Sequence, residues 1–466
     1  MKLPQVPPPF HETFSRLSKA RQAEVLFHPG EATGGDKRYL HWNDLRRKPA
    51  PAGLSAEEWW LAIKWWRLRD YRQIGLKDKQ GRPFVFGTPD NLQQSLHEID
   101  RGLGFALNLP ESVTQPDVRD SYIVSALVQE SITSSQLEGA VTTREVAKEM
   151  LRSGRQPRDK SERMILNNYL TMQRIQSLQT EPLSPELVFE LHRRVTENTL
   201  EKADAAGRFR RADENVRVED MEGNVFHEPP DARELPERLA QMCDFANGRA
   251  PDYFVHPVLR AIILHFWLAY DHPFVDGNGR TARALFYWSM LRQGYTLFEF
   301  VSISQILLRA PARYAEAFLH TETDDNDLTY FILHQTEVIT RAVEALHHYA
   351  ARKAAELKKT DLILHGLEGL NHRQQALLTH ALRHPAARYL IEGHRRSHAV
   401  TFPTARNDLF NLVERGLLSV VKEGRFNVFR PASDFQEKLG RLGENPPVVA
   451  DPDTLPLKLP FRTVQD

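Results

Sequence analysis

The chain has 466 residues, of which 41% are hydrophobic and 9% aromatic, so it can bury sizeable cores in two to four domains and is not disordered. Basic and acidic residues balance at 61 each, and the zero formal charge excludes a global electrostatic attraction to nucleic acid or membranes. The single cysteine, Cys243, excludes an intramolecular disulfide framework and is expected to be a small core residue.

The N-terminus lacks an apolar signal-peptide core, and the longest strongly apolar run covers only residues 261–270. That run is about half the length that a membrane-spanning helix needs, so it predicts a buried core helix. We therefore expect a soluble, cytoplasmic protein with no membrane partner.

Residues 1–108 are predicted to form a tryptophan-rich N-terminal extension that packs on the core. Five of the seven tryptophans fall between Trp42 and Trp66, within or near a helical pattern over residues 55–72. Ser55 and Glu58 have the spacing of a capping box at the start of that helix. The tryptophans favour an aromatic packing face, with a surface for a partner protein as the alternative. Residues 75–89 predict a turn and a short strand.

Residues 109–358 predict a compact all-helical domain. Apolar residues recur at helical spacing over 118–138, 161–178, 184–200, 235–247, 256–270, 281–292, 311–319 and 328–358. The exception is residues 215–226, where valines alternate with polar residues around Glu222-Gly-Asn, the pattern of a β-hairpin.

Residues 365–432 change character. Two helical patterns, over 373–382 and 404–415, precede residues 419–429, which alternate like a hairpin. Helices followed by a two-stranded wing predict a winged helix-turn-helix. The proline-rich residues 433–466 have little periodicity and predict a loose C-terminal tail.

The stretch His272-Pro-Phe-Val-Asp276-Gly-Asn278-Gly-Arg280-Thr-Ala-Arg283 is the strongest candidate site. Glycines on both sides of Asn278 allow the backbone to approach a ligand and to form an anion nest where a helix begins. Arg280 and Arg283 share one face of that helix and suit a polyphosphate. Asp276 supplies a hard oxygen ligand for magnesium. His272 can accept a proton from an attacking hydroxyl.

This stretch resembles the signature of the Fic family (filamentation induced by cAMP), in which His-Pro-Phe-x-(Asp or Glu)-Gly-Asn-Gly-Arg-x-x-Arg is fixed. Every fixed position matches. The resemblance implies an all-helical Fic domain that transfers AMP from ATP to a Thr, Ser or Tyr hydroxyl of a target protein, and to itself. Gly279 favours AMP transfer over the kinase-like Doc branch, where lysine replaces this glycine.

The resemblance also implies roles for single residues. They are His272 as the general base, Asp276 as the Mg²⁺ ligand, Asn278 with the backbone of Gly277 and Gly279 at the α-phosphate, Arg280 at the phosphate tail, and Arg283 at the γ-phosphate. Tyr314 aligns with an aromatic position near the nucleotide, with core packing as an equal alternative. The hairpin 215–226, with Val216, Val218 and Val225, is similar to the flap that holds a target segment by strand addition.

Ser134-Ser-Gln-Leu-Glu138-Gly139 lies at the end of the helix predicted at about 118–139. Gly139 is typical of a helix C-terminus, and Glu138 by itself would be an exposed surface residue. The stretch resembles the inhibitory motif of the Fic family, (Ser or Thr)-x-x-x-Glu-(Gly or Asn). The resemblance implies that Glu138 pairs with Arg283 and occupies the γ-phosphate position. The same glutamate could position a water that removes AMP from modified proteins, so a bifunctional enzyme or a mainly de-AMPylating hydrolase is an alternative.

The winged helix leaves a further alternative open. Residues 401–412 would form a recognition helix, and Arg395, Arg396, Arg406, Lys422 and Arg425 a basic edge. A DNA-binding regulator with a nucleotide-sensing Fic domain is thus a second hypothesis. The neutral chain favours a protein–protein or dimer-stabilising module, and relatives of this class commonly form homodimers.

Overall fold

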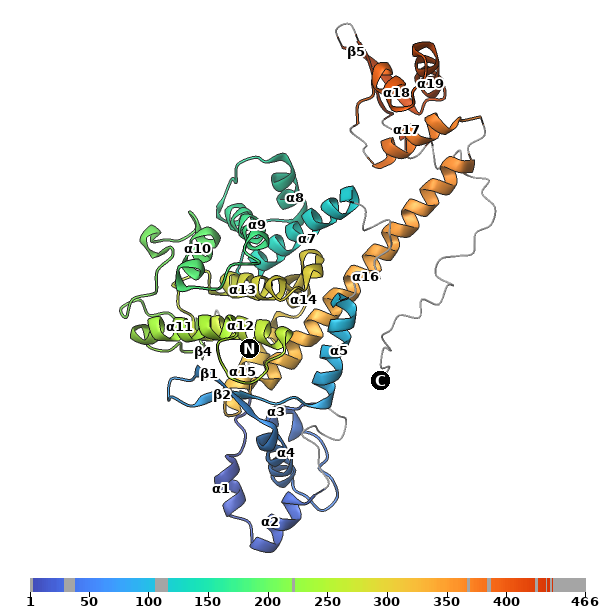
Figure 1. Ribbon diagram of the computed structural model, residues 1–466. Helices are drawn as coiled ribbons and strands as arrows, with labels where there is room; N and C mark the ends of the chain where they lie inside the picture. Colours follow the sequence, from blue (N-terminus) through green and yellow to red (C-terminus); the bar gives the residue numbers. More distant parts are fainter. Residues whose placement is uncertain are drawn as a thin grey trace. The chain divides into compact units, whose positions relative to one another are not determined.

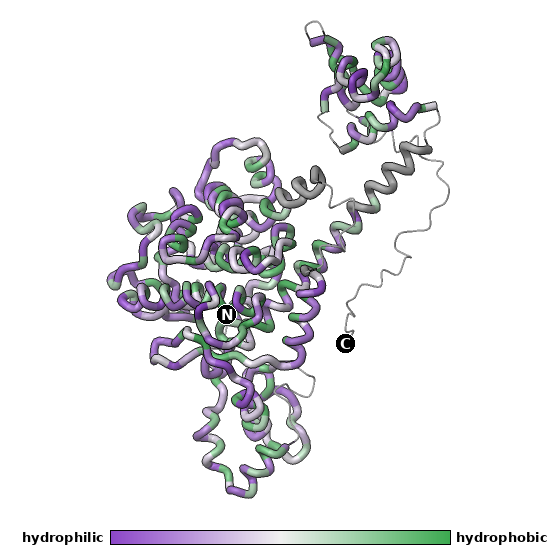
Figure 2. The backbone as a smooth tube through the Cα atoms, in the orientation of Figure 1, coloured by the Kyte–Doolittle hydropathy of each residue, from purple (hydrophilic) through white to green (hydrophobic). Residues whose placement is uncertain are grey.

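The computed structural model describes residues 3–28, 38–104, 116–219, 223–366, 369–383, 387–423 and 426–432, with single residues up to 438. The chain divides into two compact units, the first reaching His347 and the second beginning at His348. The fold is mainly α-helical, as predicted, and its strands form only two-stranded antiparallel sheets in the described residues. In Figure 2, hydrophobic and hydrophilic positions alternate along the helices, as expected for helices that bury one face.

The centre of the first unit is a pair of packed helices, α12 (Pro257–Asp271) and α13 (Asn278–Arg292), seen side by side in Figure 1. Around this pair pack α7 (Pro116–Leu137), α9 (Lys160–Ser177), α10 (Pro185–Thr196) and α11 (Leu235–Ala246). Nearly every residue of α12 and α13 is buried, because neighbouring helices cover them on several sides.

The other described helices of this unit are α1 (Phe10–Ser15), α2 (Lys19–Leu26), α3 (Trp42–Leu45), α4 (Ala56–Asp70), α5 (Asp90–Gly104), α8 (Arg144–Ser153), α14 (Ile303–Leu307), α15 (Pro311–Thr323) and the start of α16 (Thr329–Gly366). Short 3₁₀ helices within the described residues include η2 (Ala203–Ala205), η3 (Ala232–Glu234) and η4 (Thr296–Phe300). The sequence patterns did not predict α5, α8 or α14.

Two hairpins belong to the first unit. Strands β1 (Arg72–Lys77) and β2 (Pro83–Phe86) form the first, where a turn and a strand were predicted. Strands β3 (Val218–Glu219) and β4 (Val225–His227) form the second, which overlaps the predicted hairpin at 215–226 and extends one residue past it. Its strands are shorter than the alternating pattern suggested, and residues 220–222 of its turn lie outside the described residues.

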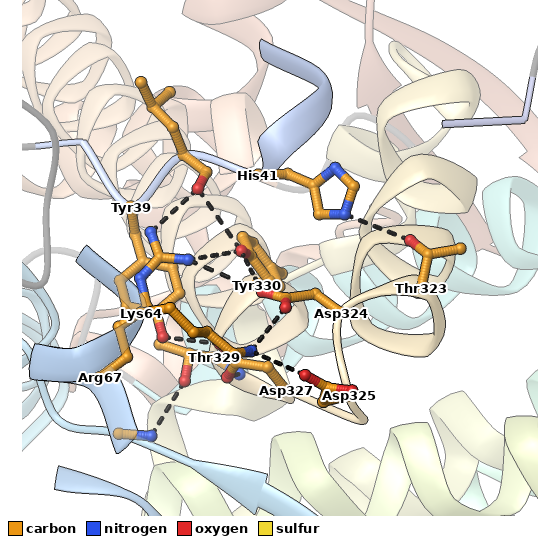
Figure 3. A network of polar contacts seen from close by, with 12 residues as sticks. Tyr39, His41, Lys64, Arg67, Thr323, Asp324, Asp325, Asp327, Thr329 and Tyr330 are labelled. Carbon is orange, nitrogen blue, oxygen red and sulfur yellow. Dashed lines mark hydrogen bonds and ion pairs between the residues drawn. The ribbon is translucent and has the colours of Figure 1, made fainter. Parts of the chain in front are cut away.

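The N-terminal segment is joined to α15 and α16 by buried polar side chains (Figure 3). Lys64 on α4 contacts Asp324 with an Nζ–Oδ1 distance of 2.5 Å. Arg67, one turn further along α4, donates to the Tyr330 hydroxyl at 2.6 Å, and that hydroxyl donates to Asp324 at 2.7 Å. Asp327 accepts from Tyr39 at 2.6 Å. These contacts fix the N-terminal segment to the helical core through charged groups.

The tryptophans of this segment are mostly internal. Trp42, Trp59 and Trp60 are buried in one apolar cluster with Leu45 and Ile63. The predicted capping box is present, since the Ser55 side chain accepts from Glu58 N and the Glu58 carboxylate accepts from Ser55 N. The burial favours the packing interpretation of these aromatic residues over a surface for a partner.

The second unit contains α17 (His372–Arg383), α18 (Ile391–Ser397) and α19 (Phe402–Glu414), followed by β5 (Leu418–Glu423) and β6 (Phe426–Pro431). Three helices and a two-stranded hairpin are the parts that a winged helix-turn-helix requires. The patterns located α17 and α19 but not α18. The turn at 424–425, including Arg425, and nearly all of the predicted tail lie outside the described residues. Among the residues that the structure describes, no helix is both long and apolar enough to cross a bilayer.

Candidate active site

The candidate site lies on the loop between α12 and α13. Helix α12 ends at His272, whose backbone is left-handed with φ of 44°, so the chain turns sharply there. The Asn278 side chain then closes the loop, since its Oδ1 accepts from Phe274 N at 3.0 Å and its Nδ2 donates to Phe274 O at 2.8 Å. Phe274 itself is fully buried and anchors the loop.

The amide of Asn278 holds the loop closed, because Oδ1 and one N–H of Nδ2 bond the backbone of Phe274 and the residue is buried. The backbone beside it forms the N-terminus of α13. Gly277 has φ of 84° and precedes the first residue of α13, which places successive N–H groups at a helix N-terminus. The helix begins three residues earlier than the predicted 281.

His272 has the hydrogen bonding of a neutral base. Its Nδ1 lies 3.2 Å from the carbonyl oxygen of Ala269, which can only accept, so Nδ1 carries the proton and Nε2 keeps its lone pair. Burial lowers the pKa of His272 to about 4. The ring is partly exposed at the loop. At neutral pH it can thus accept a proton without first losing one.

Arg280 is a buried cation with unused donors. Its Nη1 donates to Val195 O at 3.0 Å, whereas Nε and Nη2 are buried and have no hydrogen-bond partner within the described part of the chain. Nη2 lies 3.5 Å from Oδ1 of Asp276, and burial lowers the pKa of the guanidinium. Since an unpaired buried donor is costly, these two nitrogens favour an anionic ligand at the start of α13.

Arg283 is held by helix α7. Its Nε donates to Ser134 Oγ at 2.8 Å, and its Nη2 donates to Ser134 O at 3.0 Å and to Glu138 Oε1 at 2.8 Å. The guanidinium is buried, and the Glu138 side chain is 25% exposed. Gly139 follows α7 with φ of 89°, as predicted for a helix end.

The Glu138 carboxylate lies directly on the first turn of α13. A Cβ atom built on Gly279 would stand 2.2 Å from Glu138 Oε1, so only glycine leaves room for the carboxylate here. The carboxylate therefore contacts both Arg283 and the helix N-terminus. It occupies the type of position that a phosphate group takes at such an end.

Asp276 is placed where a metal ion could reach it. Its side chain is 44% exposed, and Oδ1 accepts from Gly277 N at 2.5 Å. No group of three or more His, Cys, Asp or Glu side chains able to hold a metal is present among the described residues. One exposed carboxylate beside a phosphate site fits Mg²⁺, which commonly takes its other ligands from substrate phosphates and water.

Tyr314 packs in the core and also lies near Arg283 of the candidate site, the two positions that were predicted as alternatives. Its ring packs in the aromatic cluster with Phe318 and Phe331. Its hydroxyl lies 2.8 Å from His265 Nε2, and the nearby Arg283 guanidinium partly offsets the burial that raises the Tyr314 pKa to about 12. Tyr314 thus lies beside the site as well as in the core.

The hairpin of β3 and β4 faces the loop. A cleft of about 470 Å³ is lined by Asn215, Val216, Arg217 and Glu219 on the hairpin side and by Val275 on the loop. Val218 and Val225 are half-buried, on the two short strands. The stem of the hairpin is tied to the loop, because Arg210 N donates to Pro273 O at 2.8 Å and Arg210 Nε to His272 O at 2.9 Å.

Sequence analysis missed His192 and Arg210 as neighbours of the loop. The imidazole of His192 on α10 lies between Gly207 and Asp276 and stacks on Phe274 with ring centroids 3.7 Å apart. A single histidine within an amphipathic helix carries no signal of its own. Arg210 lies in the stretch Gly207-Arg-Phe-Arg210, which precedes the hairpin and is similar to the stretch before the flap in the Fic family. Cys243, by contrast, is buried as expected, and burial raises its thiol pKa to about 12.

A helical domain with an anion-binding loop between two central helices is the class that this fold and site define. Residues 182–290, which include that loop, match the Fic/DOC family, so this part of the chain is a Fic domain.

Curated relatives agree with this assignment. The chain is 29% identical over 168 residues to "Protein adenylyltransferase Fic" of Nematostella vectensis, covering 36% of this chain and 34% of that protein. It is 35% identical over 121 residues to "Protein adenylyltransferase fic-1" of Caenorhabditis elegans, covering 26% and 21%. The matches thus span about a third or less of these relatives.

Solved structures of Fic proteins are also similar. One is a Fic family protein from Desulfovibrio desulfuricans G20, with a TM-score of 0.47, 18% identity, and coverage of 74% of this chain and 95% of that one. Another is Fic-1 of C. elegans, with a TM-score of 0.43, 21% identity, and coverage of 57% and 73%.

Proposed function

We propose that this protein transfers AMP from ATP to a hydroxyl group of a target protein and that Glu138 restrains this reaction. The observation that carries the proposal is the meeting of a neutral His272, the unused donors of Arg280 and the Arg283–Glu138 pair at the N-terminus of α13. The curated relatives named protein adenylyltransferase support the choice of reaction.

In the proposed reaction, ATP lies with its phosphates along the first turn of α13. Backbone N–H groups of Asn278 and Gly279, together with Nε and Nη2 of Arg280, would hold the phosphates. Asp276 would hold Mg²⁺, which neutralises charge on the phosphates when it is bound. His272 Nε2 takes the proton of the target hydroxyl, whose oxygen forms a bond to the α-phosphorus while the bond to pyrophosphate breaks.

Restraint follows from competition for Arg283. The γ-phosphate would need this guanidinium, and in the structure the guanidinium is bound to Glu138 and Ser134. A carboxylate over Gly279 would also repel a phosphate in the same place. Nucleotide bound in the inhibited protein would then lack the contact that orients its triphosphate for attack.

The target is proposed to dock on the hairpin. The cleft between β3 and Val275 leads to the loop that carries His272, and the short strands leave backbone groups for pairing with an extended segment. The choice among Thr, Ser and Tyr hydroxyls is left to the target that fits this cleft.

For the second unit we propose a protein-binding or dimer-stabilising role before DNA binding. Several of its cations are already paired, Arg395 and Arg396 with Glu392, and Arg388 and Arg430 with Glu423. Paired arginines attract a phosphate backbone less than free ones. A mobility shift with random duplex DNA that fades steeply with salt would reverse this order.

The test of the proposed function uses ATP labelled at the α-phosphate or, in parallel, at the γ-phosphate. Glu138→Gly protein with Mg²⁺ is expected to label itself from α-labelled ATP at least about tenfold faster than wild type, and not from γ-labelled ATP. Adding His272→Ala to this variant should lower the rate by about 10²–10⁴-fold.

The outcomes separate the rival hypotheses. Label from γ-labelled ATP alone would indicate a kinase instead, and equal α-label with and without His272 would exclude the proposed base. Loss of AMP from a pre-labelled protein that requires Glu138 would support the hydrolase alternative.

A further inference from the structure

The buried histidine on α10, His192, contacts the loop between α12 and α13. It is fully buried, and its two ring nitrogens bind two separate segments of backbone. Nδ1 lies 2.9 Å from the N–H of Gly207, and Nε2 lies 2.9 Å from the carbonyl oxygen of Asp276. The ring is thus a bridge between the stem of the hairpin and the loop.

The two partners fix the tautomer of His192. The Gly207 N–H can only donate, so Nδ1 must accept, and the Asp276 carbonyl can only accept, so Nε2 must carry the proton. Neither nitrogen is left for a substrate. The ring face is also used, since it stacks on Phe274 with an interplanar angle of 9°.

The carbonyl group that His192 binds belongs to Asp276, the same residue whose side-chain carboxylate is the proposed Mg²⁺ ligand. The next residue, Gly277, has a left-handed backbone, and a Cβ there would stand 2.6 Å from Thr196 Cγ2 and 3.5 Å from the His192 ring. Helix α10 therefore packs closely against the loop at Gly277, and His192 on the same helix binds the loop at Asp276. The direction of the Asp276 side chain depends on this short stretch of backbone.

We propose that His192 is a positioning residue that sets the Asp276 carboxylate for Mg²⁺–ATP through its Nε2 bond to the Asp276 carbonyl. It acts on the carboxylate without touching the nucleotide. The inference rests on the proposed AMP transfer for its consequence in catalysis, whereas the link from His192 to the loop is a property of the chain alone.

Three substitutions separate the functions of the ring. His192→Gln places an amide donor near the Nε2 position and can keep the bond to Asp276. His192→Asn places an amide oxygen near the Nδ1 position and can keep the bond to Gly207. His192→Phe keeps the stacked ring and loses both hydrogen bonds. All three are made in the Glu138→Gly background, where the restraint on ATP is absent.

The experiment measures the Mg²⁺ concentration that gives half-maximal transfer from α-labelled ATP. Loss of one buried hydrogen bond to the loop is expected to raise this concentration about tenfold in His192→Phe and His192→Asn. His192→Gln is expected to stay within about twofold of the parent. Thermal midpoints of the variants are measured alongside, because a purely structural role would make the Mg²⁺ requirement follow stability.

Two further readouts do not need transfer. The first is the affinity for Mg²⁺–ATP, measured by calorimetry after each His192 substitution is added to His272→Ala/Glu138→Gly protein. We expect weaker binding with His192→Phe and His192→Asn than with His192→Gln. Hydrogen exchange of the Gly207 amide should be slow in the parent and in His192→Asn, and fast in His192→Phe and His192→Gln. The amide readout reports the bridge directly and works even for a variant with low activity.

The results distinguish the inference from the function on which it rests. Equal Mg²⁺ requirements in Asn and Gln variants, with AMP transfer intact, would overturn the role of His192 and leave the proposed function standing. Absence of AMP transfer, with the predicted order in Mg²⁺–ATP binding, would overturn the function and leave the positioning role standing. Fast exchange of the Gly207 amide in the parent would remove the bridge itself.

Discussion

Two regions of the molecule bury arginine and carboxylate, and they do so in opposite ways. In the network of Figure 3, Lys64 and Arg67 both contact Asp324, and the side chains of Lys64 and Asp324 are both about 1% exposed. At the loop, two nitrogens of Arg280 have no hydrogen-bond partner in the described residues, and Arg283 is held by the partly exposed Glu138. The first pair is enclosed by the fold, whereas the second has a carboxylate partner that solvent can reach.

The two regions differ in how accessible the partner of each buried charge is to solvent. The network joins α4 to α15 and α16, and Lys64, Arg67 and Asp324 at its centre are almost completely buried. The site keeps the Arg283 guanidinium buried and pairs it with the partly exposed Glu138 carboxylate, just after the end of α7. Under the proposed function, the enclosed pairs are structural, and the Arg283–Glu138 pair is the one that a nucleotide replaces.

Removing one partner of the closed network should produce the largest effect. Lys64→Met leaves the Asp324 carboxylate buried with less compensation and is expected to lower the free energy of unfolding by about 3–5 kcal/mol. Chemical denaturation measures this value. Lys79→Met is the control, since its ion pair with Glu228 is about half exposed and should contribute less than about 1 kcal/mol. Equal losses in the two variants would contradict the comparison.

The double variant Lys64→Met/Asp324→Leu sharpens the same point. Replacing both charges removes the uncompensated carboxylate, so this protein is expected to recover part of the stability lost by Lys64→Met alone. A double variant that is less stable than the single one would mean that Asp324 serves mainly Arg67 and Tyr330, with which it also interacts.

Acid should act on buried histidines of both regions. Burial lowers the pKa of His41, in the network, and of His265, beside Tyr314, from 6.5 to about 3. Such residues bind fewer protons folded than unfolded, so stability is full above about pH 6.5 and is lost as the pH falls below it. Asp271 opposes this trend between about pH 6 and 3.8, because burial raises its pKa to about 6.

The free energy of unfolding is expected to fall by about 2 kcal/mol or more between pH 7 and pH 5. Denaturation at pH 7, 6 and 5 measures the change, and His41→Gln should flatten it. Transfer by folded protein should resist the same acid, since the pKa of His272 is lowered to about 4. Stability that is constant from pH 7 to pH 5 would refute the prediction.

The two regions also differ in how far sequence could predict them. The loop residues lie within twelve positions, and their types, glycine spacing and arginine spacing predict an anion site without knowledge of the fold. Lys64 and Asp324 are 260 residues apart, and nothing in either local pattern indicates the other. His192 was missed for the same reason, because its meaning depends on Gly207 and Asp276, which only the fold brings to it.

Even within the loop, the sequence predicted which residues form the site better than it predicted the hydrogen-bond partners of their side chains. Arg280 and Arg283 were expected on one face of α13. In the structure, Arg280 donates to Val195 on α10 and Arg283 to Ser134 on α7, so the two guanidinium groups lie between different helices. Asn278 was assigned to the phosphate, and the structure gives its side chain a second role, which is to close the loop. Helical spacing predicts roughly which way a side chain points from its helix, but the neighbouring helices determine which atoms it contacts.

The smallest expected effect tests whether the Arg283 contact is exchangeable. Ser134→Ala removes the hydroxyl that accepts from Arg283 Nε and leaves Glu138 in place, so the restraint should weaken by about 1 kcal/mol. Self-labelling from α-labelled ATP is then expected to rise about fivefold, less than in Glu138→Gly. Ser135→Ala is the matched control, because the adjacent Ser135 hydroxyl is buried without a hydrogen-bond partner in the described residues.

If Ser135→Ala raised the rate as much as Ser134→Ala, the gain would reflect general loosening of α7 and not the loss of one contact to Arg283. If Ser134→Ala lowered the rate, the hydroxyl would be needed to orient Arg283 for ATP, and the serine would serve the active state. A modest rise confined to Ser134→Ala would instead show that the inhibited state is maintained by separable contacts of about 1 kcal/mol each. Contacts of that strength would allow ATP to displace Glu138 from Arg283, because the binding of ATP must outweigh them.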